Sequence, residues 1–159
     1  MLIDSHCHLN MLLEKEGFNI ASILKEADDN GVKIIQNICT SIEEFDEILK
    51  LSQQYKNVYC SLGIHPEYIK DEIITVEELI EKSKNKNVIG IGEVGLEYHY
   101  EPLDKVKQKK NFAVHIEASR QTALPLIVHS RDADDDMIEM LESEMKNGEF
   151  PFVLHCFSS

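Results

Sequence analysis

Short apolar segments recur along this chain, and most of them end in a histidine or a carboxylate. Six such segments are present, and five end in this way: LIDSHCH, VYCSLGIH, VIGIGE, LPLIVH and FVLH. The sixth, VKIIQNI, has no such residue at its end. Segments with the periodicity of amphipathic helices separate neighbouring apolar runs, so the pattern predicts alternating strands and helices that build a parallel sheet.

The histidines and carboxylates at the ends of these segments are the candidate catalytic and metal-binding residues. In a parallel α/β barrel all strands end on one face, which brings together residues that are far apart in the sequence. No repeat or Pro/Gly-rich linker interrupts the order, and the composition is 43% hydrophobic, which is ordinary for a globular domain. We therefore predict one α/β domain of the barrel type over residues 1–159, with one cluster at the mouth formed by His6, His8, Glu93, His129 and His155.

Known signals of helix ends bound several predicted helices. Two segments have the capping-box pattern, in which a serine or threonine precedes a glutamate by three residues, and a glycine or a proline ends two other helices. These signals are Ser41 with Glu44, Thr75 with Glu78, Gly31 and Pro125. We predict a long helix over residues 103–122 and a last helix over residues 133–145, with the acidic run 132–136 at its start.

Charge and cysteine content restrict the function and the compartment. The net charge is −13, from 29 acidic and 16 basic residues, so the surface as a whole repels a phosphate backbone and any contact with nucleic acid must be local. The four cysteines have no CxxC spacing, which favours reduced thiols and the cytoplasm; we expect Cys7 and Cys156 to point into the core. No apolar stretch approaches the roughly 20 residues of a membrane span.

The histidines and Glu93 form the ligand mixture of a metal site. His6 and His8 are two residues apart on an extended segment, so both imidazoles point to the same side. Imidazole with carboxylate suits zinc, manganese and similar divalent ions, and a carboxylate such as Glu93 can bridge two of them. Each histidine taken singly is also compatible with a strand-end residue that bonds a loop. All of them at matching strand ends favour the metal site, and two ions fit the set.

Several residues near this cluster have two possible roles. His65, in GIHP, is either a structural loop histidine or a contact for a substrate phosphate. Arg131 can pair with a phosphate oxygen or with Asp132. The loop at Tyr98, His99 and Tyr100 can stack a base or pack over the barrel rim. The glycines around Glu93 do not match a phosphate-binding loop, and we interpret them as a sign of close strand packing.

Five motifs, taken in order, resemble those of the TatD family of metal-dependent deoxyribonucleases: DSHCHL, GIHP, IGEVGLEYHY, LPLIVHSRDADDD and LHCFSS. The resemblance covers the whole chain. It implies a TIM-barrel (β/α)8 fold of the amidohydrolase superfamily, two divalent metal ions (zinc, manganese or magnesium) and hydrolysis of DNA. It also implies that His6 and His8 hold one metal, that Glu93 bridges, that His129 and His155 hold the other, and that His65 lies near the scissile phosphate. Glu97 departs from the aspartate usual in the family.

The resemblance also implies two further strands and a metal-site aspartate that this sequence does not contain. We therefore expect only about the first six strands with their helices, an impaired DNase activity, and open sheet edges that favour self-association. Two other functions stay open: a catalytically incomplete metal-binding or interaction module, and a related hydrolase of amides or esters.

Overall fold

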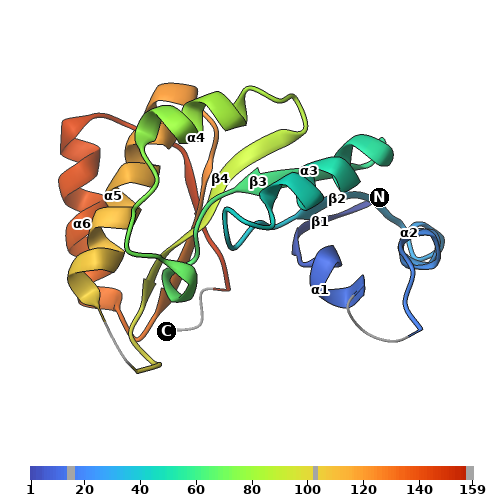
Figure 1. The fold of residues 1–159 in the computed structure, drawn as a ribbon, viewed down its shortest axis with the longest axis horizontal. Coiled ribbons are helices and arrows are strands. Elements are labelled where there is room, and N and C mark those ends of the chain that lie inside the picture. Colours follow the sequence, from blue (N-terminus) through green and yellow to red (C-terminus); the bar gives the residue numbers. More distant parts are fainter. Residues whose placement is uncertain (14–16, 102–103, 157–159) are drawn as a thin grey trace.

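A parallel six-stranded sheet forms the centre of the molecule. The computed structural model describes residues 1–13, 17–101 and 104–156. In space the strands follow their order in the chain, and every neighbouring pair is parallel. They are β1 (Leu2–Cys7), β2 (Val32–Asn37), β3 (Val58–Leu62), β4 (Val88–Glu97), β5 (Leu126–Arg131) and β6 (Phe152–Leu154). The predicted α/β fold is confirmed: six strands curl into part of a barrel, with α2 at one end of the sheet and α5 and α6 at the other (Figure 1).

Helices alternate with these strands, as the sequence predicts. They are α1 (Leu9–Leu13), α2 (Ile20–Asp29), α3 (Phe45–Gln54), the 3₁₀ turn η1 (Pro66–Tyr68), α4 (Val76–Ser83), α5 (Lys105–Thr122) and α6 (Asp134–Asn147). The main core lies between the sheet and the helices, where Leu62, Ile91, Leu96, Phe112 and Ile116 are fully buried. This packing of the helices against the sheet holds the strands, and with them the C-terminal strand ends, in fixed positions. Among the described residues, no helix is long and apolar enough to cross a membrane.

Strands β4 and β5 approach each other closely because β4 carries glycines. A Cβ atom at Gly92 would lie 2.6 Å from the Ile127 carbonyl oxygen, and one at Gly95 would overlap the His129 carbonyl oxygen. Both glycines also have positive φ, of 132° and 152°, which side chains rarely tolerate. The interpretation of these glycines as close-packing positions is confirmed, and their packing places Glu93 beside His129.

The helix-end signals are confirmed at α4 and wrong at α3. Thr75 and Glu78 form the capping box at the start of α4. Helix α3 begins only at Phe45, and Ser41 does not cap it. The Glu44 carboxylate instead accepts hydrogen bonds from the loop before the helix, including the Ser41 backbone N–H at 3.0 Å, so it stabilises a turn that delays the helix.

The other helix ends lie near their predicted positions. Helix α5 ends at Thr122, before Pro125, and Ala123 follows in the left-handed conformation with φ 57°. Helix α6 begins at Asp134, with its acidic residues in the first turn, and continues to Asn147, two residues beyond the prediction. Leu103, the predicted start of the long helix, lies outside the described residues.

Candidate metal centre

The predicted ligands converge at the C-terminal ends of the strands. His6 lies near the end of β1 and His8 directly follows that strand; Glu93 belongs to β4 and His129 to β5. His155 follows β6, where its backbone N–H donates to the Val128 carbonyl oxygen at 2.9 Å. His65 follows β3 and begins η1. Residues separated by up to about 150 positions in the sequence therefore share one site because parallel strands end together.

Glu93 occupies the middle of this cluster, with each carboxylate oxygen directed to different imidazoles. Its Oε2 lies 3.1 Å from His6 Nε2 and 4.0 Å from His8 Nε2. Its Oε1 lies 3.1 Å from His129 Nδ1. The side chain is almost completely buried. Two ligand groups are thus built around one carboxylate: His6, His8 and Glu93 form the first, and His65, Glu93 and His129 form the second.

His129 is held from both sides by carboxylates. Its Nε2 lies 3.1 Å from Glu97 Oε2, while Nδ1 faces Glu93. Glu97 is itself buried, and its backbone N–H donates to the Gln108 side chain of α5 at 2.9 Å. In the sequence Glu97 stands out only as a departure from the family motif, which does not indicate its contact with His129. Its position four residues after Glu93 on an apolar strand is the signal that could have identified it.

Within the second group, the His65 ring packs against that of His129. The imidazole lies edge-on to His129, with 4.3 Å between ring centroids. Its Nδ1 accepts a hydrogen bond from the Glu67 backbone N–H at 3.3 Å, and the residue is buried. The structural role is confirmed, because His65 caps the turn η1; the residue also lines the cavity of the cluster, and its contact with a substrate phosphate stays a prediction.

His155 lies on the side of His6. Their rings stack in parallel, with centroids 3.4 Å apart and an interplanar angle of 7°. The donor atoms gathered around His129 come from His65 and Glu93 in this structure, not from His155. The pairing of His155 with His129 on one metal, which the resemblance implies, therefore stays a prediction.

The pKa values of Glu93 and His129 are shifted so that both residues favour their charged forms. Burial alone would raise the pKa of the Glu93 carboxyl, but interactions with His129 and His6 outweigh it and hold the pKa well below its usual range. Burial alone would lower the pKa of His129, but hydrogen bonds with Glu93 and Glu97 raise it above its ordinary value.

Three other histidines, His65, His8 and His155, are biased towards their neutral form. Burial, with the His129 imidazole nearby, lowers the pKa of His65 to about 4. Burial also lowers the pKa of His8 and, together with His6, that of His155. Because a neutral imidazole has a free lone pair, these residues can act as metal ligands at neutral pH.

The donor set fits divalent metal ions. The ring nitrogen His8 Nδ1 is buried and has no hydrogen-bond partner, and the buried His6 Nε2 faces the Glu93 carboxylate at 3.1 Å without the geometry of a hydrogen bond. Buried polar atoms without partners are uncommon in native proteins, and a bound ion is one way in which such atoms are satisfied. Imidazole nitrogens with one shared carboxylate are a donor set that zinc and manganese accept.

Arg131 is not among the residues that line the cavity of the cluster, and it contacts Tyr100. Its NH1 group donates to the Tyr100 hydroxyl at 3.1 Å, and its guanidinium lies 4.8 Å from the centre of the Tyr100 ring. Asp132, the alternative partner, pairs instead with His99, at 2.8 Å. Tyr98 packs against the core, and its hydroxyl donates to Asp136 at 2.6 Å, as expected for a residue that packs over the barrel rim. Tyr100 is half exposed.

The burial of the cysteines differs from the prediction at one position. Cys39 and Cys60 are buried, and Cys7 is partly buried against the smaller core cluster. Cys156 is exposed, so its predicted core position is wrong. Its φ of 50° turns the chain out of the extended conformation directly after His155, and strand alternation therefore no longer determines where its side chain points.

Comparison with known proteins identifies relatives along the whole chain. The family model described as TatD related DNase matches residues 3–159. An uncharacterised metal-dependent hydrolase of Buchnera aphidicola subsp. Baizongia pistaciae is 37% identical over 99% of this chain and 59% of its own length. The protein named deoxyribonuclease Tat-D of Schizosaccharomyces pombe is 30% identical over 86% of this chain and 48% of its own length.

Solved structures show the same fold. YJJV, a TatD homologue from Escherichia coli K12, superposes with a TM-score of 0.81 and is 27% identical, over 99% of this chain and 60% of that one. This chain thus spans about 60% of the length of the relatives that match it over its full extent.

Proposed function

This chain belongs to the TatD related DNase family, and from that membership we propose that it hydrolyses DNA phosphodiester bonds with two divalent metal ions. The names of its relatives support a metal-dependent hydrolase, and the name of the Schizosaccharomyces pombe relative adds deoxyribonuclease. The observation that carries the proposal is the Glu93 carboxylate, whose two oxygens face two separate groups of imidazoles.

The proposed ligand roles follow the family resemblance, while in this structure His65 groups with His129 and His155 stacks on His6. His6 and His8 would hold one ion, His129 with His155 would hold the other, and Glu93 would bridge them. The donor types permit zinc, manganese or magnesium, because affinity order and supply decide between such ions. When bound, a pair of ions activates a water molecule and stabilises the negative charge that develops on the phosphoryl oxygens.

The residues of the chain would orient the substrate around this pair. His65 is neutral at pH 7, and because its Nδ1 accepts from the Glu67 N–H, its proton resides on Nε2. It would donate that hydrogen to a non-bridging oxygen of the scissile phosphate. Arg131 would contact a neighbouring phosphate of the same strand, as a planar guanidinium can bind two phosphate oxygens. The cavity at the cluster, about 230 Å³, has room for a phosphate group.

A cleavage assay with a labelled oligonucleotide tests the proposal. We expect cleavage that requires added manganese or magnesium, stops with a chelator, and disappears in His129→Ala and Glu93→Gln. The exposed Glu139→Gln in α6 is the matched control for the second variant and should retain full activity. Cleavage that survives His129→Ala would refute the site assignment.

Two results would favour the other functions. A chain that binds metal with high affinity but cleaves no DNA would be a metal-binding module. Metal-dependent cleavage of an amide or a carboxylic ester, with no action on DNA, would indicate a hydrolase of a different substrate class.

The compartment is part of the same proposal. All four cysteines are unpaired, which suits the reducing conditions of the cytoplasm. We therefore propose DNA in the cytoplasm as the substrate.

A further inference from the structure

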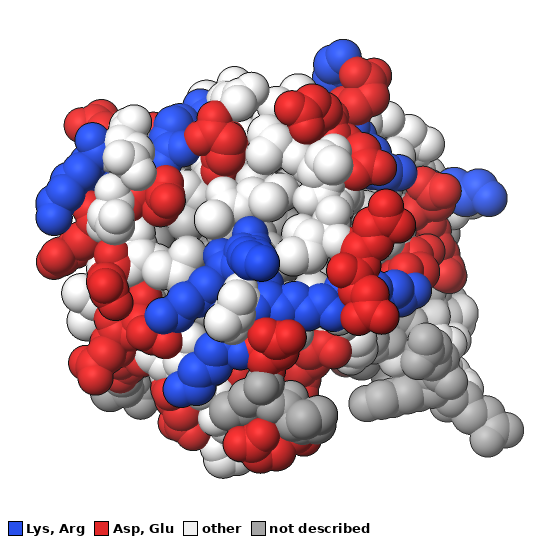
Figure 2. Space-filling view, turned by 60° about the vertical axis from the view of Figure 1, so that its left-hand side comes forward, with Lys and Arg blue, Asp and Glu red and all other residues white. Residues whose placement is uncertain are grey.

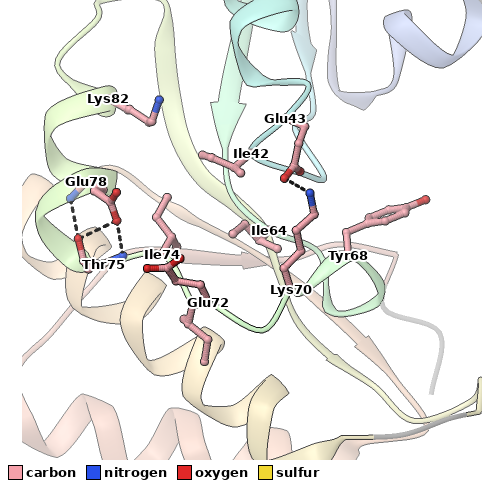
Figure 3. A pocket seen from close by; sticks show the side chains of 11 residues that line it. Ile42, Glu43, Ile64, Tyr68, Lys70, Glu72, Ile74, Thr75, Glu78 and Lys82 are labelled. Atoms are coloured by element: carbon pink, nitrogen blue, oxygen red, sulfur yellow. Dashed lines mark hydrogen bonds and ion pairs between the residues drawn. The ribbon is translucent and has the colours of Figure 1, made fainter.

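A second, larger cavity adjoins the metal centre. It has a volume of about 410 Å³ and lies between the loops that follow β2 and β3 and the start of α4. Figure 3 shows side chains from these segments turned towards a common space. Apolar walls come from Ile42, Ile64 and Ile74, and charged groups at the rim include Lys70 and Lys82. Both loops are on the face of the sheet that holds the metal ligands.

Tyr68 connects this cavity with the metal centre. It lines both cavities, and its ring lies 6.0 Å from that of His65. The cavity at the metal ligands, about 230 Å³, is below the usual 300–1,000 Å³ of pockets that hold an organic ligand, whereas the neighbouring one is within it. A nucleotide whose phosphate lies at the metal centre therefore needs a second space for its base. This cavity shares Tyr68 with the metal-ligand cavity and is larger than the one of about 290 Å³ that shares Glu67 with it.

The walls of the cavity are held in place before any ligand binds. The Ile64 backbone N–H donates to His115 Nε2 at 3.2 Å, and its carbonyl oxygen accepts from Asn111 Nδ2 at 2.9 Å. Ile64 and Ile74 are both buried. On the opposite side the capping box of Thr75 and Glu78 fixes the start of α4. A preformed pocket avoids the entropic cost of ordering its walls on binding.

The chemistry of the rim argues against a phosphate and favours a base. Lys70 is paired with Glu43, and the Glu78 carboxylate accepts from the Thr75 N–H at 2.9 Å, so the start of α4 is capped by a negative group. A nucleobase is a flat ring with polar edges, so its faces can pack against the isoleucine walls while its edges meet the polar groups of the rim. Carboxylates can accept from the exocyclic amino group of adenine or cytosine, and lysine can donate to ring nitrogens or carbonyls.

We propose that this cavity binds a nucleobase of the DNA strand, next to the phosphate at the metal centre. The inference rests on the proposed function, because only a DNA-cleaving chain needs a base site beside the metal centre. Binding of a base can nevertheless be measured without hydrolysis. The chain carries a net charge of −13, and Figure 2 shows acidic side chains beside and below the basic ones near the middle of the face. Apolar contact with bases would therefore contribute to affinity where charge does not.

A metal-free NMR titration tests the proposal directly. Deoxyadenosine 5′-monophosphate should shift the methyl signals of Ile42, Ile64 and Ile74, and deoxyribose 5-phosphate, which lacks the base, should not. Ile73→Trp, which fills the cavity from its lining, should weaken binding of the nucleotide about tenfold or more, in line with the loss of one bound base. Ile138→Trp, on the exposed face of α6, is the control and should bind as the wild type does.

Equal shifts with both compounds, or none with the nucleotide, would overturn the proposal even if Ile73→Trp does not fold. Where the wild type cleaves DNA, Ile73→Trp should raise KM more for a normal oligonucleotide than for an abasic one of the same length. Nucleotide binding in this cavity by a chain that cleaves no DNA would contradict the proposed function and leave the base site standing.

Discussion

The Nδ1 atom of His129 lies 3.1 Å from Oε1 of Glu93, where β4 and β5 run side by side. Each residue shifts the pKa of the other towards its charged form. A cation placed between them would take over the role of the imidazolium proton, since metal binding requires neutral histidine and ionised carboxylate. The pair therefore links the electrostatics of the folded chain to the proposed metal centre.

Glu97 should orient His129 for metal binding. Its carboxylate faces His129 Nε2, and removal of such a supporting contact typically lowers metal affinity 10- to 100-fold. We expect Glu97→Gln to weaken binding of manganese by about that factor in calorimetric titrations. Glu142→Gln, exposed on α6, should bind as the wild type does. Unchanged affinity in Glu97→Gln would mean that His129 is oriented by Glu93 and packing alone.

His115 should make the fold sensitive to acid. It is fully buried, and burial lowers its pKa to about 4, below the roughly 6.5 of an unfolded histidine. As the pH falls from about 6.5 towards 4, the unfolded chain binds the proton first, so the free energy of unfolding decreases, by up to about 3 kcal/mol from this residue.

Urea unfolding between pH 4 and pH 7 measures that contribution. His115→Gln retains a donor and an acceptor but does not titrate, so its unfolding free energy should fall less with acid than that of the wild type. Parallel pH profiles for the two proteins would assign the acid sensitivity to other groups.

Gly95 should tolerate no side chain. A methyl group there would overlap the His129 carbonyl oxygen, and φ is 152°. We expect Gly95→Ala to cost about 3 kcal/mol or more of unfolding free energy, because both backbone strain and overpacking oppose it. Ser143→Ala on α6 should cost little. A stable Gly95→Ala protein with normal metal binding would show that β4 and β5 can separate without disturbing Glu93 and His129.

The open sheet edges should drive self-association. In the described part of the chain the sheet runs from β1 to β6 without closing, and Leu2, Ile3 and Val153 on those strands are more than half exposed. Unpaired edges with apolar side chains favour pairing with a second copy. Light scattering after size exclusion should therefore show a mass that rises with concentration.

Val153→Lys should shift this equilibrium towards the monomer, because a charged side chain disfavours edge pairing. Ile138→Lys, which replaces an equally exposed residue of α6, should leave it unchanged. A monomer at all concentrations would refute the association.

The sequence was sufficient to predict the features that depend on local periodicity and on the shared end of parallel strands. It placed His6, Glu93 and His129 at one face, and it identified the glycines of β4 as packing positions. It did not predict that Glu44 would delay α3, because the competing hydrogen bonds of the 40–44 turn have the same sequence signature as a capping box. Nor did it predict the stacking of His155 on His6, which depends on how far the sheet curls.

The most direct test is the metal content of the purified chain, determined by elemental analysis after equilibration with manganese or zinc and removal of loosely bound ions. A two-metal centre around Glu93 predicts about two ions per chain, and their loss in His6→Ala/His129→Ala, with a circular dichroism spectrum that remains native. A wild-type chain without bound metal, or a double variant that retains both ions, would contradict the proposed metal centre.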